Sequence, residues 1–136
     1  MLILNNNEFF DECKIRLNEI YRFKKTGKDN KFFGAKLSAE IKSIKRDYIV
    51  KLIKFYMNDQ DITPTAANNI IKNVLNRGVS NVYLLKIFGT TFRTASNKSD
   101  FFKKNTDEIE NEIKFEMEKF IQRFNKILIE IKENHS

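Results

Sequence analysis

Cationic and aromatic residues gather between positions 22 and 36 in a pattern that suits nucleic-acid binding. Six cations surround the adjacent rings of Phe32 and Phe33, and only Asp29 opposes them: Arg22, Lys24, Lys25, Lys28, Lys31 and Lys36. Lysines can follow phosphates while exposed rings stack on the bases of a single strand. Alternatively, both rings close the end of a helical core while the lysines point into water. Three further cations extend this basic surface: Lys42, Lys45 and Arg46.

Residue types that carry catalysis are sparse. His135 is the only histidine and the penultimate residue, where chains usually fray. Cys13 lies on an apolar stripe, which favours a small buried thiol over a nucleophile. The chain has no phosphate loop, no Gly-rich dinucleotide turn and no pair of histidines for a metal. We therefore expect no enzymatic activity, no metal and no cofactor, and we expect function to survive Cys13→Ala or removal of His135 and Ser136.

Three carboxylates near the C-terminus have the spacing of one helical face. Glu108, Glu112 and Glu116 recur every four residues, so a di-metal or acid–base site could be built there. The alternative is a solvated helix face on which Glu110 and Lys114 form an i,i+4 pair. We favour the solvated face, because a metal site in a helical bundle usually includes histidine ligands.

The charge of the chain is strongly uneven. The net charge is +7, with 20 Lys/Arg and 10 Asp/Glu in residues 1–105 and 5 against 8 in residues 106–136. The basic part favours attraction to phosphate or to an acidic protein. Lys, Asn and Ile also have AT-rich codons, so a biased genome is an equally good source of the charge. Specific recognition of bases and phosphates usually prefers Arg, which is outnumbered by Lys.

Composition restricts the class of protein. A chain of 136 residues with four Gly and one Pro fits one domain built from long helices. No apolar run approaches the roughly 18 residues of a membrane span. Because one cysteine excludes an internal disulfide and the start lacks the pattern of a signal peptide, we expect a cytoplasmic protein.

The strongest helical pattern covers Asp107–Glu133. Seven apolar residues recur there at steps of three or four and therefore share one face of a helix. These residues are Ile109, Ile113, Met117, Phe120, Phe124, Ile127 and Ile131. A helix of this length, roughly 40 Å, would form the spine of a bundle or half of a contact with a partner.

Four further segments are predicted to be helices. The first covers about Glu8–Lys25, with Asn5 or Asn7 as its cap. Its buried stripe consists of Phe10, Cys13, Leu17, Ile20 and Tyr21. The other helices are expected at about Ala35–Met57, at Pro64–Arg77 with Gly78 as the residue after its end, and at Val82–Thr94. The segment Val82–Phe88 is apolar nearly all round, so periodicity alone does not separate a buried helix from a buried strand.

The junction of the last two of these helices resembles a helix-turn-helix motif. The resemblance rests on the turn formed by residues 77–80 and on apolar residues at Val79, Leu84 and Ile87. The chain departs from that pattern at Val74 and Arg77, and its second helix is too apolar to lie in a DNA groove. An ordinary corner between two bundle helices is therefore the favoured interpretation.

These observations predict an all-α, single-domain bundle of about five helices over residues 1–136. The favoured function is non-enzymatic binding of nucleic acid or a nucleoprotein complex through the basic surface. The alternative is a helical protein-interaction module, such as an inhibitor, immunity or adaptor protein, with an acidic protein partner. The composition suits an accessory protein of an AT-rich bacterium, phage or plasmid.

Overall fold

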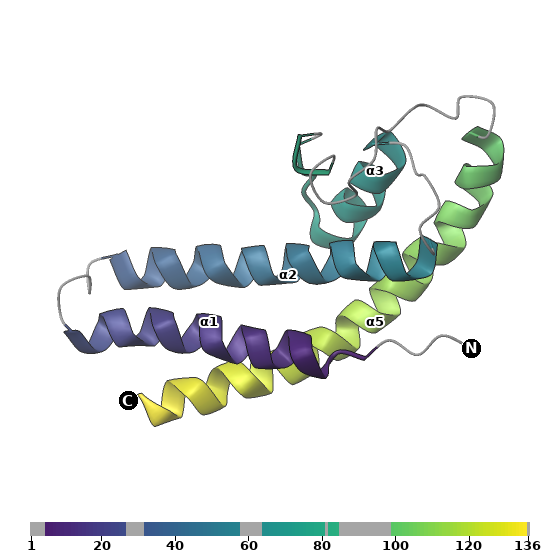
Figure 1. Ribbon diagram of the computed structural model, residues 1–136. Coiled ribbons are helices and arrows are strands. Elements are labelled where there is room, and N and C mark those ends of the chain that lie inside the picture. Colours follow the sequence, from purple (N-terminus) through teal and green to yellow (C-terminus); the bar gives the residue numbers. More distant parts are fainter. Residues whose placement is uncertain (1–4, 27–31, 58–63, 81, 85–98, 136) are drawn as a thin grey trace. The chain divides into compact units, whose positions relative to one another are not determined.

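The protein is all-α, as the sequence predicts. The computed structural model describes residues 5–26, 32–57, 64–80, 82–84 and 99–135, and these ranges contain helices and no strand (Figure 1). The helices are α1 (Asn7–Thr26), α2 (Phe33–Met57), α3 (Pro64–Leu75) and α5 (Ser99–Asn134). None of the helices in the described part of the chain is long and apolar enough to cross a membrane.

The chain forms two compact units, whose boundaries fall inside α2 and α5. Unit 1 consists of residues 1–45 and 118–136, and unit 2 consists of residues 46–117. Because both boundaries lie within continuous helices, the sequence shows no linker rich in Gly, Pro or Ser to mark them.

Unit 1 packs α1 alongside the first half of α2 and the last part of α5 (Figure 1). The side chain of Asn5 accepts a 3.0 Å hydrogen bond from the Asn7 backbone N–H and so satisfies one donor at the start of α1. All five residues of the predicted α1 stripe are buried: Phe10, Cys13, Leu17, Ile20 and Tyr21. Phe10 stacks on Phe120 of α5, and Ile44 of α2 is also buried in this unit, so the helical periodicity identified this core correctly.

Unit 2 is formed by the second half of α2, by α3 and by the first part of α5. Its core contains aliphatic side chains from each of these helices, together with Tyr48. The aliphatic residues are Ile49, Val50, Leu52, Ile53, Ala67, Ile70, Ile71, Leu84, Ile113 and Met117. The second half of α2 is therefore buried on more sides than the first half, in which Ile44 is the only buried residue among those that the structure describes.

The end of α3 differs from the sequence prediction. The helix stops at Leu75, and Asn76 takes the left-handed conformation with φ of 58° that was expected of Gly78. Asparagine tolerates this conformation better than other residues with a side chain. Gly78 has another role, because the Asn68 amide lies where a side chain at position 78 would be. The Asn68 Oδ1 atom accepts a 2.9 Å hydrogen bond from the Val79 backbone N–H.

The described part of the ambiguous segment is helical. Residues 82–84 form a helical turn in which the Leu84 backbone N–H donates to the Ser80 carbonyl at 3.1 Å. The Ser80 hydroxyl oxygen accepts a second bond from the Tyr83 N–H at 3.2 Å, as an N-cap does. The rest of the predicted helix, residues 85–94, lies outside the described residues.

The long C-terminal helix is confirmed and is longer than predicted. It contains 36 residues, and its backbone begins at Ser99 instead of Asp107. Six of the seven residues of its predicted stripe are buried, and Ile109 is half-buried. The early start has a physical reason: residues 99–106 contain no Gly or Pro that would stop a helix.

Candidate nucleic-acid interface

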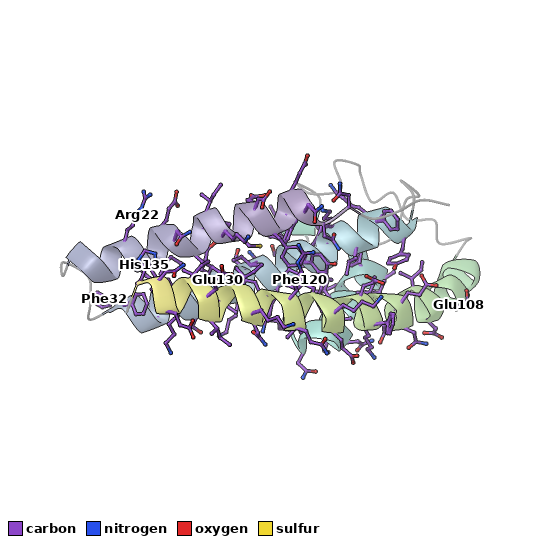
Figure 2. All side chains as sticks on the ribbon, turned by 90° about the horizontal axis from the view of Figure 1, so that it is seen from below. Arg22, Phe32, Glu108, Phe120, Glu130 and His135 are labelled. Carbon is purple, nitrogen blue, oxygen red and sulfur yellow. The ribbon has the colours of Figure 1, made fainter. Side chains whose placement is uncertain are left out.

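The basic surface centres on one end of unit 1. There α1 ends, α2 begins and α5 ends, so residues distant in the sequence come together. Figure 2 shows Arg22, Phe32 and His135 at this end, each from a different segment of the chain. Arg22 is exposed, as are Lys36 and Lys42 on α2, whereas Lys45 is half-buried.

Tyr21 connects the three helices at this end. Its ring is 2% exposed, and it lies edge-on to Phe33 with centroids 5.1 Å apart and stacks on His135 at 5.5 Å. Burial raises the pKa of the Tyr21 phenol above its ordinary value, so the ring stays neutral at physiological pH. Tyr21 is therefore a neutral, buried ring that contacts both Phe33 and His135.

His135 is part of this end of unit 1, where its ring packs on Tyr21, and the survival of function without it stays a prediction. Its Nε2 atom lies 2.9 Å from Asn18 Oδ1, and its Nδ1 atom is buried without a hydrogen-bond partner. Because Asn18 Oδ1 is an acceptor, His135 Nε2 is the donor in this contact. Sequence reasoning missed the contact because it joins residues 117 positions apart, and nothing in the local pattern indicates which helices pair.

The two adjacent phenylalanines have different environments. Phe33, the first residue of α2, is half-buried against Tyr21. Phe32 is 55% exposed. The sequence offered two alternatives for the pair, stacking rings or core residues. Phe33 is half-buried and packs on the buried ring of Tyr21, whereas Phe32 has an exposed position from which it could stack on a ligand.

An ion pair joins α1 to the first half of α2. Glu40 is the only carboxylate between residues 32 and 45. It pairs with Arg16 of α1, whose Nη2 atom also donates a 3.2 Å hydrogen bond to Ser43 Oγ. Arg16 therefore holds α1 against the first half of α2 through Glu40 and Ser43.

The side chains of four other predicted site residues, all of them lysines, lie outside the residues that the structure describes. The backbone positions of Lys24 and Lys25 fall in the last turn of α1, where cations also stabilise the negative end of a helix. Their side chains lie outside the described part of the structure, as do Lys28 and Lys31 altogether.

Arg46 belongs to unit 2 and has a partner there. It is half-buried, and its guanidinium lies 4.4 Å from the centroid of the Tyr83 ring. The Tyr83 hydroxyl donates a 2.7 Å hydrogen bond to Asp47 Oδ1. Burial first, and then Asp47, raise the pKa of Tyr83 above its ordinary value of 10.0, although Arg46 opposes this rise. Arg46 therefore contributes to packing within its own unit.

The described residues include the thiol and the carboxylates that the sequence analysis considered for nucleophilic, metal and acid–base chemistry. Cys13 is completely buried, in agreement with its apolar stripe. No group of three or more His, Cys, Asp or Glu side chains in the described ranges is arranged to hold a metal ion. Glu110 pairs with Lys114 at 3.0 Å and accepts a 3.1 Å hydrogen bond from Asn73, whereas Glu108 and Glu112 are exposed. Glu116, the third carboxylate of the predicted set, is half-buried, and the pKa of Tyr56 is raised by burial first and then by Glu116 and Glu112.

Comparisons of the chain with protein-family models, curated proteins and solved structures find no match.

Proposed function

We propose that the protein is a non-enzymatic binding protein whose ligand is nucleic acid, held with little sequence preference by the basic end of unit 1. The observation that supports this proposal most directly is the exposure of three cations of unit 1: Arg22 near the end of α1, and Lys36 and Lys42 on the first half of α2. Phe32, 55% exposed, adds an aromatic surface next to these cations.

The mechanism combines two physical effects. Phosphates that approach the lysines release condensed counterions, and this release favours binding at low salt. A base of a single strand can then stack on Phe32, which is a contact worth about 1–3 kcal/mol in other proteins. Neither effect reads base edges, so the proposed binding tolerates many sequences.

A salt-dependent binding assay tests the proposal. Affinity for a fluorescent single-stranded oligonucleotide should fall steeply with salt, with a log–log slope of about −0.7 for each phosphate neutralised. The double substitution Lys36→Glu and Lys42→Glu should weaken binding and flatten the slope. Lys72→Glu is the matched control, because Lys72 is an exposed lysine of α3 in unit 2.

Absence of binding to both DNA and RNA at ~50 mM salt would overturn the proposal, since electrostatic binding is strong under those conditions. The same cations would then be assigned to an acidic protein partner, which is the alternative that the sequence leaves open. Such a partner needs the lysines but not base stacking on Phe32.

A further inference from the structure

We propose that His135 is a positioning residue for the basic surface, acting through Tyr21 and Phe33 on the first turn of α2. This inference rests on the proposed function, but one arm of its test does not require nucleic acid. It assigns a role to His135, which directly follows α5 and which the sequence analysis expected to be dispensable.

A continuous series of ring contacts connects His135 to the start of α2. The imidazole stacks on Tyr21 with an interplanar angle of 19°, and Tyr21 meets Phe33 edge-on at 64°. Phe33 is the first residue of α2, and Phe32 directly precedes it. Removing the imidazole would therefore uncover one face of the ring on which Phe33 packs.

The contact between Phe33 and Tyr21 is one of the interactions that hold the first turn of α2. Glu8 lies in the first turn of α1, whereas the first turn of α2 contains no acidic residue to complement the positive end of the helix. The first N–H groups of any helix also lack partners within it. The contact between Phe33 and Tyr21 therefore helps to hold the turn that contains Lys36 and directly follows Phe32.

The environment of the imidazole favours an indirect role over a phosphate contact. Its Nε2 atom is engaged with Asn18, and its Nδ1 atom is buried. Neither ring nitrogen is directed at a ligand on the surface. His135 therefore contributes to binding by holding Tyr21 in place.

Three variants test the inference: His135→Ala, His135→Phe and the control Asn134→Ala, an exposed neighbour. The first measurement is hydrogen exchange at the amides of Leu37, Ser38 and Ala39, which donate to the first-turn carbonyls in an α-helix. We expect faster exchange in His135→Ala, and rates close to wild type in His135→Phe, which keeps a ring to stack on Tyr21. Asn134→Ala should leave these rates unchanged.

The second measurement is oligonucleotide affinity over a salt series. His135→Ala should weaken binding by about fivefold or more, as coupling between two sites does, with the salt slope unchanged. A flatter slope would show a lost phosphate contact and would overturn the positioning role. Unchanged exchange in His135→Ala, or no rescue by His135→Phe, would also overturn it, even if the wild type binds. A wild type that binds no nucleic acid would refute the proposed function instead, and the exchange data would still decide whether His135 orders α2.

Discussion

The ring of Phe10 stacks on the ring of Phe120 with centroids 5.4 Å apart, joining α1 to the last part of α5. Phe120 also stacks on Phe124 at 5.5 Å and receives the edge of Phe9 at 5.8 Å. The guanidinium of Arg123 covers the Phe10 ring at 4.1 Å. Phe120 therefore lies at the centre of an aromatic cluster within unit 1.

Truncation of this cluster should destabilise the fold. Phe120→Ala and Phe124→Ala should each lower the free energy of unfolding by about 3–5 kcal/mol, because each removes a buried ring and leaves a cavity. Ile129→Ala is the matched control on the same helix, since Ile129 is 56% exposed. Urea denaturation followed by circular dichroism measures the effect. If both Phe variants unfold like the wild type but lose self-association, the stripe is an intermolecular interface and the core assignment is wrong.

Local periodicity predicted the helices and their buried faces well. The stripes of α1 and α5 follow from side-chain spacing within one helix, so no knowledge of neighbouring helices was needed. The same principle explains why residues 82–84 remained ambiguous. They are apolar on several sides, and the helical assignment comes from hydrogen bonds to Ser80 that no spacing pattern reveals.

Contacts between distant segments account for what the sequence did not predict. Arg46 was grouped with the surface lysines because it is a cation next to Lys45, but its neighbour in the fold is Tyr83. His135 was expected to fray because it is penultimate, but its ring packs on Tyr21. Both contacts depend on which segments pack against each other, and the spacing of apolar residues within one helix does not predict that.

The turn after α3 offers a test of a hydrogen bond by a double-mutant cycle. Gly78→Ala should cost about 0.5–1.5 kcal/mol, because the new methyl group displaces the Asn68 amide from the Val79 N–H. Asn68→Ala should cost a similar amount. The two effects should not add, since both remove the same bond. Gly34→Ala is the control: nothing lies within 4 Å of the new Cβ, so it should be neutral or stabilising. Fully additive costs in chemical denaturation would contradict this account.

Alkaline pH should destabilise the protein through its tyrosines. The folded pKa of Tyr83 is raised above 10.0, mainly by burial and then by Asp47. Its contribution to stability is therefore complete below about pH 10 and is lost as the pH rises through the folded pKa. Burial also raises the pKa of Tyr21 and Tyr56, the latter with help from Glu116 and Glu112.

Tyr83→Phe separates the contribution of Tyr83 from the contributions of Tyr21 and Tyr56. At neutral pH it should cost about 1 kcal/mol, because the hydrogen bond to Asp47 is lost. Above about pH 10 the variant should lose less stability than the wild type for each further unit of pH. Melting temperatures measured at pH 8, 10 and 11 provide the check. An identical loss in both proteins would show that the Tyr83 phenol does not titrate abnormally.

Phe32 and Phe33 provide the sharpest comparison, because they are adjacent and have the same side chain in different environments. Phe33→Ala should lower the melting temperature, since its ring packs on Tyr21. Phe32→Ala should leave stability nearly unchanged and weaken single-strand binding by about 1–3 kcal/mol if the ring stacks on a base. Binding to a duplex of the same sequence should change less, because its bases are already stacked on one another. Thermal melting and fluorescence anisotropy on the two variants separate these effects. If Phe32→Ala destabilises the fold as much as Phe33→Ala does, both rings belong to the core, and the proposed interface retains its lysines but has no stacking residue.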